Sequence, residues 1–501
     1  MIFQPTIKRR DMINCALCDN APCDKACPAG LNPSTRLRSI WFGGEQHSVI
    51  SLPALNACED CQAPCEKACL NSGLVSIKKL ISRLKSEIKA TVSREQIANE
   101  DVLQTDICGI PLENPFLLSS SVVSSNYDMC ARAFEAGWAG VSFKTICNFD
   151  IHETSPRYSA ITGGSSIIGF KNIEQLSNHS VMENMEIFKK LKRNYPHKFL
   201  MVSIMGRNDE EWSQLAKGCE DTGVDAIELN FSCPNMVEAG LGSDIGQSPE
   251  YVERFTKAAC SGIKIPVLAK LTPNVATMCE AAEAAQRGGA RGISAINTIK
   301  SIMRINLDTF VSSPAVGAAS AVGGYSGKAV KPIALRFIAE LGNDKALTGM
   351  HISGMGGIET WQDAAEFILL GAGSVQVTTA VMQYGYRIID DLKAGMNYYL
   401  KDRGFKNIRE LVGLGLSHVS STTDVLERDT IVYPKFILKS CIGCGRCGIS
   451  CRDGGHQAIE MKDKRPVLNL KRCVGCHLCT LVCPNGAIQS SERRVHKQEE
   501  W

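Results

Sequence analysis

Four groups of four cysteines, two near each end of the 501-residue chain, are the residues best suited to redox chemistry. Both C-terminal groups have the spacing C-x2-C-x2-C-x3-C, and the second ends in Cys-Pro. Their members are Cys441, Cys444, Cys447 and Cys451, and Cys473, Cys476, Cys479 and Cys483. This spacing is typical of a segment that holds two [4Fe-4S] clusters, in which the last thiolate of each group binds the other cluster. We therefore expect Cys483 to complete the first cluster and Cys451 the second.

The two N-terminal groups have a looser spacing, C-x2-C-x4-C-x3-C and C-x2-C-x3-C-x3-C. Their members are Cys15, Cys18, Cys23 and Cys27, and Cys58, Cys61, Cys65 and Cys69. If the last Cys of each group again binds the other cluster, we expect crossed ligand sets. One cluster takes Cys15, Cys18, Cys23 and Cys69, and the other takes Cys27, Cys58, Cys61 and Cys65. Zinc is an open alternative for all four groups, because C-x2-C pairs also occur in zinc sites, although a third close Cys and the Cys-Pro ending fit zinc poorly. For the two N-terminal cysteine groups, disulfide bonds are a further open alternative.

Composition indicates a globular protein of more than one domain, with 44% hydrophobic and 21% charged residues. The net charge of +3 gives no extended basic surface, so nucleic acid is not an expected partner. The first ten residues lack the apolar core of a signal peptide, and no apolar stretch reaches the roughly 18 residues of a membrane span. Because so many thiolate ligands require reducing conditions, we expect a cytoplasmic protein that is not bound to a membrane.

The middle of the chain alternates short apolar runs with helical patterns. The runs expected to be strands are 116–121, 140–145, 199–206, 226–234, 266–273, 292–299, 347–357 and 374–381. The stretches 209–221, 249–261, 278–287 and 361–370 have apolar residues at helical spacing. This alternation predicts a (β/α)8 TIM barrel, with an open doubly wound sheet as the alternative. We expect an N-terminal helical iron–sulfur domain (1–95), the barrel (96–425) and a C-terminal ferredoxin-like domain with two [4Fe-4S] clusters (426–501).

Polar residues follow these expected strands at their carboxyl ends, where barrel enzymes place their chemistry. They are Lys144, Asn230, Cys233, Lys270, Asn297, Thr298, Gly356, Gly357, Thr378 and Thr379. Glycines after the last two strands permit a phosphate to approach the backbone closely, although tight turns alone would also explain them. A phosphorylated cofactor is therefore expected at this corner of the barrel.

No stretch of the sequence predicts a paired FAD and NAD(P) binding unit. Residues 443–448 match G-x-G-x-x-G, but they lie inside a cysteine run and follow no expected strand. We therefore expect a partner subunit that binds FAD and NAD(P)H, and hence a hetero-oligomer.

Three short motifs of the barrel resemble those of dihydropyrimidine dehydrogenases. They are Asn230-Phe231-Ser232-Cys233-Pro234, Ala269-Lys270-Leu271-Thr272-Pro273-Asn274 and Ile296-Asn297-Thr298. The likeness covers roughly residues 105–488, includes Gly324-Tyr325-Ser326-Gly327-Lys328, and is closest in layout to the FMN and iron–sulfur subunit of the bacterial NAD-dependent enzymes. Residues 1 to about 90 resemble the N-terminal iron–sulfur domain of the long animal enzymes, whose flavin and nicotinamide domains are absent here.

The resemblance implies FMN over the barrel mouth, with Lys144 and Lys270 beside its ring, where a cation would stabilise the reduced flavin. The remaining cofactor ligands that it implies are Ser120, Ser326, Gly327, Gly356, Gly357, Thr378 and Thr379. It assigns the pyrimidine base to Asn172, Asn230, Asn297 and Thr298. Carboxamides suit a uracil ring because both present donors and acceptors.

The resemblance also implies that Cys233 is the general acid and base of the reaction. FMN would deliver a hydride to C6 of the pyrimidine while the thiol protonates C5, and oxidation would reverse these steps. A thiol with a pKa of about 8.5 serves both directions, and Gly240, Gly242 and Gly246 predict a mobile loop behind it.

The expected function is the interconversion of uracil or thymine with the 5,6-dihydro compounds, with electrons relayed from the partner subunit through four [4Fe-4S] clusters. Two alternatives are an oxidoreductase for dihydroorotate or another cyclic amide, and an electron-transfer subunit without turnover in the barrel.

Overall fold

The computed structural model describes residues 9–50, 55–163, 166–235, 241–420 and 422–496. It divides into two compact units, Met1–Val419 and Ser420–Trp501. The first unit contains the barrel and the N-terminal helices, and the second contains the C-terminal cysteine groups.

Eight parallel strands close the barrel of the first unit. They are β3 (Phe116–Leu118), β4 (Gly140–Ile146), β7 (Phe199–Ile204), β8 (Ala226–Asn230), β9 (Val267–Lys270), β10 (Gly292–Ala295), β13 (His351–Met355) and β14 (Ser374–Val377). Each strand lies within, or overlaps, one of the predicted apolar runs. Because β10 pairs with β13 and β14 pairs with β3, the sheet has no free edge. The predicted TIM barrel is therefore confirmed, and the open sheet is excluded.

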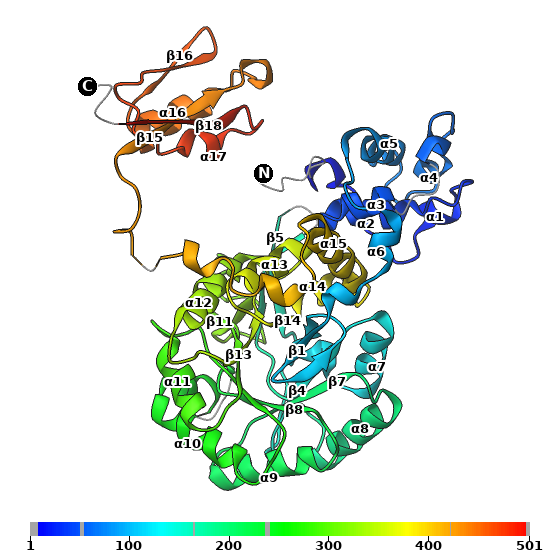
Figure 1. Ribbon diagram of the computed structural model, residues 1–501, viewed down its shortest axis with the longest axis vertical. Helices are drawn as coiled ribbons and strands as arrows, with labels where there is room; N and C mark the ends of the chain where they lie inside the picture. The colour runs from blue at the N-terminus through cyan, green and yellow to red at the C-terminus, as the bar shows by residue number, and fades with distance from the viewer. Residues whose placement is uncertain (1–8, 51–54, 164–165, 236–240, 421, 497–501) are drawn as a thin grey trace. The chain divides into compact units, whose positions relative to one another are not determined.

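Amphipathic helices surround the strands, as Figure 1 shows for the cyan to yellow part of the chain. They are α7 (Tyr127–Ala136), α8 (Val181–Asn194), α9 (Asp209–Glu220), α10 (Pro249–Cys260), α11 (Cys279–Arg287), α12 (Lys331–Asn343), α13 (Trp361–Leu369), α14 (Thr379–Tyr384) and α15 (Ile388–Asp402). Reciprocal caps fix where two of them begin, with Ser180 and Glu183 at α8, and Thr360 and Asp363 at α13. Their buried faces are apolar, as the three-to-four spacing predicts.

A hairpin of β1 (Thr105–Ile107) and β2 (Ile110–Leu112) precedes the first barrel strand. Ile107 and Leu112 pack with Leu117, Phe199 and other residues near the starts of the barrel strands. This small core is separate from the main apolar core, so the amino end of the barrel is filled with side chains.

A second sheet, which the sequence analysis did not anticipate, lies outside the barrel. Its antiparallel strands have the order β11 (Ile299–Ser301), β12 (Gly323–Ser326), β6 (Ser166–Asn172) and β5 (Tyr158–Gly163). Two insertions supply these strands, one after β4 and one after β10. Pairing of Gly324 with Asn172 brings the two insertions together.

The N-terminal helices are short and form part of the same unit as the barrel. They are α1 (Pro22–Lys25), α2 (Pro33–Phe42), α3 (Glu45–Ile50), α4 (Pro64–Lys67), α5 (Ile77–Glu87) and α6 (Arg94–Ala98). The segments 21–27 and 63–69 both read Ala-Pro-Cys-acid-Lys-Ala-Cys, and α1 and α4 both begin after an alanine in the left-handed conformation. This internal repeat places the two N-terminal cysteine groups in equivalent local structures.

Polar contacts join the N-terminal helices to the barrel. Arg38 on α2 donates from Nε to Asp391 Oδ2 on α15 at 3.0 Å, and Trp41 donates from Nε1 to Tyr384 OH at 3.2 Å. Trp361 Nε1 donates to the carbonyl oxygen of Gly43 at 2.7 Å. These groups are largely buried, so water competes little for them.

The C-terminal unit is built from two antiparallel strand pairs and two short helices. Its elements are β15 (Thr430–Phe436), α16 (Arg446–Gly454), β16 (Ile459–Lys462), β17 (Arg465–Leu468), α17 (Leu478–Val482) and β18 (Ile488–His496). Strand β15 pairs with β18, and β16 pairs with β17. Cys447 and Cys479 share its small core with Ile459 and Ile488. Within the described ranges of both units, no helix has the length and apolar character needed to span a membrane.

We predict that Arg38→Ala lowers the free energy of unfolding by about 3 kcal/mol, because it leaves the Asp391 carboxylate buried without its partner. Urea unfolding at pH 8 measures this loss, since burial raises the pKa of Asp391 to about 6 and the group is ionised there. The matched control is Arg254→Ala, which removes an exposed pair with Asp209 and should have a much smaller effect, because solvent screens exposed charges. Equal losses of unfolding free energy in the two variants would show that the buried Arg38–Asp391 pair contributes no more to stability than an exposed pair.

Candidate active site

A cavity at the carboxyl ends of the barrel strands gathers every residue that the sequence analysis assigned to cofactor or substrate. These residues are Ser120, Lys144, Asn172, Asn230, Cys233, Lys270, Asn297, Thr298, Ser326, Gly327, Gly356, Gly357, Thr378 and Thr379. The second sheet supplies Asn172 and Ser326, and the strand ends or the loops after them supply the others. Sequence analysis missed several further lining residues, namely Tyr158, Glu174, Asn235, Lys328, Glu359 and Gln376.

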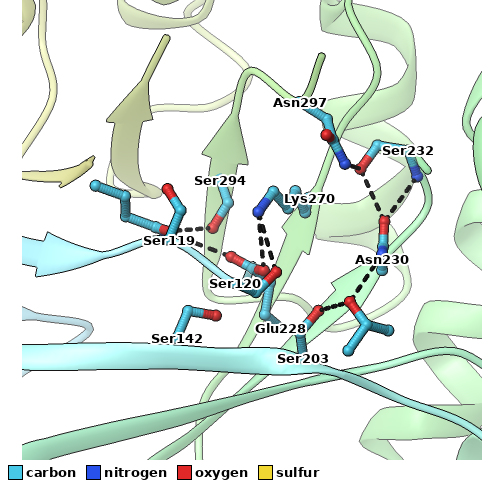
Figure 2. Close-up of polar contacts among 12 residues, drawn as sticks. Ser119, Ser120, Ser142, Ser203, Glu228, Asn230, Ser232, Lys270, Ser294 and Asn297 are labelled. Carbon is cyan, nitrogen blue, oxygen red and sulfur yellow. Dashed lines mark hydrogen bonds and ion pairs between the residues drawn. The ribbon is translucent and has the colours of Figure 1, made fainter. Parts of the chain in front are cut away.

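Lys270 ends β9 and is only 3% exposed. Its ammonium lies 3.3 Å from Glu228 Oε1 on β8 and donates to Ser120 Oγ at 3.2 Å (Figure 2). Asn230 pairs with Lys270 in the strand register, so the residue two places earlier on β8 lies beneath the lysine. The buried charge is therefore offset by a carboxylate that is itself fully buried.

Lys144 lies near the end of β4 and forms a second ion pair. Its ammonium is 2.7 Å from Glu174 Oε1 and 3.7 Å from Glu153 Oε1. Tyr158 OH donates to the other oxygen of Glu174 at 2.6 Å. Burial and this bond raise the pKa of Tyr158, so the phenol remains a donor. The cost of burying an unpaired lysine therefore does not identify Lys144 or Lys270 as functional, because both have carboxylate partners.

Hydrogen bonds hold the predicted substrate carboxamides in fixed orientations. Asn230 donates to Thr145 Oγ1 at 2.9 Å and accepts from Ser232 Oγ at 3.0 Å. Ser232 in turn accepts from Asn297 Nδ2 at 2.7 Å, and Figure 2 shows this chain of bonds beside Lys270. The side chain of Asn172 accepts at 3.1 Å from Asn235 Nδ2, which lies in the loop after β8. These hydrogen bonds thus fix the orientation of the carboxamides that line the cavity.

Cys233 follows β8 and is 7% exposed. Burial raises the pKa of its thiol to about 11, while Lys144 and Lys270 exert a smaller lowering effect. The sequence-based expectation of an ordinary thiol pKa is therefore wrong for this structure, because the burial of a single Cys cannot be read from its neighbours in sequence. The thiol is protonated near neutral pH.

The glycines after Cys233 differ in their structural roles. Gly240 lies outside the described residues, whereas Gly242 and Gly246 belong to a short 3-10 helix (Gly242–Gln247) that is largely buried. A Cβ on Gly246 would lie 2.0 Å from the carbonyl oxygen of Phe231. Close packing therefore accounts for Gly246 without any need for mobility.

Four small cavities contain the predicted cluster cysteines, one set in each. The sets are Cys15, Cys18, Cys23 and Cys69; Cys27, Cys58, Cys61 and Cys65; Cys441, Cys444, Cys447 and Cys483; and Cys451, Cys473, Cys476 and Cys479. No three His, Cys, Asp or Glu side chains of the described residues are grouped as a single metal ion would require. Four thiols around a cavity, rather than around a point, suit a cubane better than a zinc ion.

The closed barrel, the polar cavity at the carboxyl ends of its strands and the four cysteine sets are the features expected of a barrel oxidoreductase with fused iron–sulfur segments. Residues 102–400 match the family model of dihydroorotate dehydrogenase, and residues 437–490 match that of the 4Fe-4S dicluster domain. The chain belongs to the dihydroorotate dehydrogenase family and, within it, to the dihydropyrimidine dehydrogenases.

Named relatives support this placement. The chain is 52% identical over 363 residues to the NAD-dependent dihydropyrimidine dehydrogenase subunit PreA of Escherichia coli K12, covering 72% of this chain and 88% of the relative. It is 37% identical over 344 residues to the chloroplastic NADP-dependent dihydropyrimidine dehydrogenase of Arabidopsis thaliana, covering 66% and 80%. It is 38% identical over 315 residues to the catalytic subunit of dihydroorotate dehydrogenase B of Pyrococcus abyssi, covering 63% and 99%.

The raised thiol pKa predicts how Cys233 reacts with a small alkylating reagent. The rate of Cys233 modification, followed by peptide mass spectrometry, should rise about tenfold per pH unit between pH 7 and 10, because only the thiolate reacts. Burial slows the reaction at every pH but leaves this slope unchanged. A rate that levels off near pH 8.5 would show that the thiol has an ordinary pKa, and the labelled peptide must disappear in Cys233→Ala.

Proposed function

We propose that the chain is the pyrimidine-binding, iron–sulfur subunit of a dihydropyrimidine dehydrogenase. It interconverts uracil or thymine with the 5,6-dihydro compound. The observation that carries this proposal is one cavity in which a buried thiol, oriented carboxamides and two buried lysines lie together. The names of the E. coli and Arabidopsis relatives support the same reaction.

The cavity fits FMN. Two buried oxygens of lining residues, Gln376 Oε1 and Asn235 Oδ1, have no hydrogen-bond partner in the described structure. Gly327, Gly356 and Gly357 have φ of 89°, 123° and 85°, so their backbone lies open where a Cβ would not be tolerated. Bound FMN supplies hydride transfer.

Two sets of residues in different parts of the cavity would bind the ring of the cofactor and its phosphate-bearing tail. We assign the ring to Lys144, Lys270 and Ser120. We assign the phosphate and ribityl tail to Ser326, Gly327, Gly356, Gly357, Thr378 and Thr379. Ser326 Oγ lies 3.0 Å from Thr379 Oγ1, so these two hydroxyls already face the same region.

We assign the pyrimidine base to Asn172, Asn230, Asn297 and Thr298. The lysines that line the described cavity, Lys144, Lys270 and Lys328, lie near Glu174, Glu228 and Glu359 respectively. A carboxylate substrate such as orotate would have to compete with these glutamates for a cation. The arrangement therefore favours a neutral pyrimidine over the dihydroorotate alternative.

Cys233 is assigned to proton transfer at C5 of the pyrimidine. In the reductive direction the thiol donates its proton, and the neighbouring lysines stabilise the thiolate that remains. In the oxidative direction the thiolate must form first and accept the proton. Because burial disfavours the thiolate, the oxidative direction gains most from a rise in pH.

We propose four [4Fe-4S] clusters, each held by one of the four cysteine sets that line separate cavities. They would relay single electrons between the flavin and an FAD- and NAD(P)H-binding partner subunit, in a hetero-oligomer of a reducing, cytoplasmic compartment. The word "subunit" in the name of the E. coli relative supports such a partner.

The substrate is tested by a half-reaction that needs no partner. Protein carrying FMN and clusters is reduced with dithionite without oxygen and then mixed with uracil, thymine or orotate. Flavin reoxidation by uracil or thymine is expected to be fast, and Cys233→Ala should slow it about a hundredfold or more while retaining FMN and iron. Reoxidation by orotate alone would favour the dihydroorotate alternative, and none with any pyrimidine would favour an electron-transfer subunit.

The crossed ligand sets make a prediction about iron content. Cys69→Ala should remove one cluster, about a quarter of the bound iron, with the loss confined to the set that contains Cys15. Cys279→Ala is the matched control, because this partly buried thiol lies outside the four sets and should retain all iron. Iron analysis and EPR of the reduced protein measure both. Loss of two clusters, or of none, from Cys69→Ala would contradict the assignment.

A further inference from the structure

A fully buried carboxylate, Glu228, lies inside the barrel next to the proposed flavin site. Its Oε1 is 3.3 Å from the ammonium of Lys270, and its Oε2 accepts from Gln376 Nε2 at 3.4 Å. Lys270 and Gln376 line the cavity, whereas Glu228 is not among the lining residues. Glu228 therefore contacts two groups that face the cofactor without facing it itself.

Glu228 dictates which end of the Gln376 carboxamide points to the barrel interior. An ionised carboxylate only accepts hydrogen bonds, so the amide group facing it must be the NH2 group. The same nitrogen lies 3.1 Å from Ser353 Oγ and 3.2 Å from Ser294 Oγ, whose hydroxyls could donate or accept and so impose no orientation. Gln376 Oε1 is then the atom without a partner among the described residues, and it remains to accept a bond from a bound ring.

The ring of oxidised flavin presents an N–H donor on its pyrimidine portion. A fixed carboxamide oxygen in the cavity wall is a suitable acceptor for this donor. If Gln376 were reversed, its NH2 group would face that donor and the bond would be lost. The orientation imposed by Glu228 therefore determines whether Gln376 can bind the ring.

Glu228 also reduces the positive potential that Lys270 projects into the cavity. The carboxylate lies 3.3 Å from the ammonium, so its opposite charge offsets part of the potential that the ammonium exerts on a bound ring. A bare ammonium there would stabilise the reduced, negatively charged flavin and make it a weaker hydride donor. Reduction of a pyrimidine needs a strong hydride donor, so a partly neutralised lysine suits this reaction.

We propose that Glu228 is a positioning residue of the flavin site, which orients Gln376 to accept a bond from the flavin ring and offsets the charge of Lys270. This inference rests on the proposed FMN site. It assigns no new chemical step to Glu228, which touches neither flavin nor substrate.

The test is Glu228→Gln, which keeps the size of the side chain and removes its charge. The flavin reduction potential, measured by equilibration with redox dyes, should become more positive. The dissociation constant of FMN should rise up to about tenfold, the loss expected for one hydrogen bond between neutral groups. Reoxidation of the reduced flavin by uracil should become slower, and its reduction by dihydrouracil faster.

Ser353→Ala is the matched control, because it removes a neutral partner of the same Gln376 nitrogen and leaves Glu228 in place. Its potential and FMN affinity should match those of the wild type, and Glu228→Asp should restore most of the wild-type potential. A merely structural role predicts a lower melting temperature in Glu228→Gln with the potential and FMN affinity unchanged, and this result would overturn the proposal.

Gln376→Leu serves if Glu228→Gln does not fold. It should weaken FMN binding about tenfold, whereas unchanged FMN affinity would overturn the orienting role. Failure of the proposed function is seen separately, in wild-type protein that binds no FMN or whose reduced flavin no pyrimidine reoxidises. Wild-type protein that binds FMN but is inactive with pyrimidines still reports the effect of Glu228 through the potential.

Discussion

The burial of a lysine ammonium inside a β-barrel is the constraint on which the rest of the site depends. A charge in this environment requires an opposite charge and further hydrogen bonds, or it becomes neutral. Glu228 supplies the opposite charge, and Gln376 and Ser120 supply further bonds. Fully buried serines then replace apolar side chains in the barrel, at Ser142, Ser203, Ser294, Ser353 and Ser374. Apolar packing instead occurs between the strands and the surrounding helices, and at the amino ends of the strands, where the β1–β2 hairpin packs.

The N-terminal helices are connected to the same cavity through hydrogen bonds. Trp41 donates to Tyr384 OH, and Tyr384 donates at 2.8 Å to Glu359, which lines the cavity. Leu37 and Arg38, about one helical turn before Trp41 on α2, line the cavity of the Cys15 set. The walls of the flavin cavity and of one cysteine cavity are thus joined by a short run of buried contacts within one compact unit. This accounts for the inclusion of the N-terminal region in the same unit as the barrel.

The sequence was sufficient to predict the barrel and to predict residues that line its cavity, because both predictions follow from local patterns. Apolar runs of strand length mark the eight strands, and the carboxyl ends of parallel strands must meet on one side, which brings Lys144, Asn230 and Lys270 together. The second sheet was missed because β11 and β12 are three or four residues long and β12 begins with two glycines. Glu228 was missed because one acid in an apolar strand gives no periodic signal, although its position two residues before Asn230 places it on the same face of the strand. The repeat of Ala-Pro-Cys-acid-Lys-Ala-Cys was legible in the sequence and would have supported the crossed N-terminal ligand sets.

Two features of the site that no local pattern reveals act in the same direction. Burial keeps the Cys233 thiol protonated near neutral pH, so that a proton is available for donation and little thiolate is present to accept one. The Glu228 carboxylate lies 3.3 Å from the Lys270 ammonium and offsets its charge, and by our proposal this would make a reduced flavin bound here a stronger hydride donor. Pyrimidine reduction needs a proton donor and a hydride donor together, whereas oxidation of the dihydro compound needs the opposite of both. We infer that the substrate-free site is arranged for reduction, and that the oxidative direction requires a rise in pH or a substrate that itself alters the environment of the thiol.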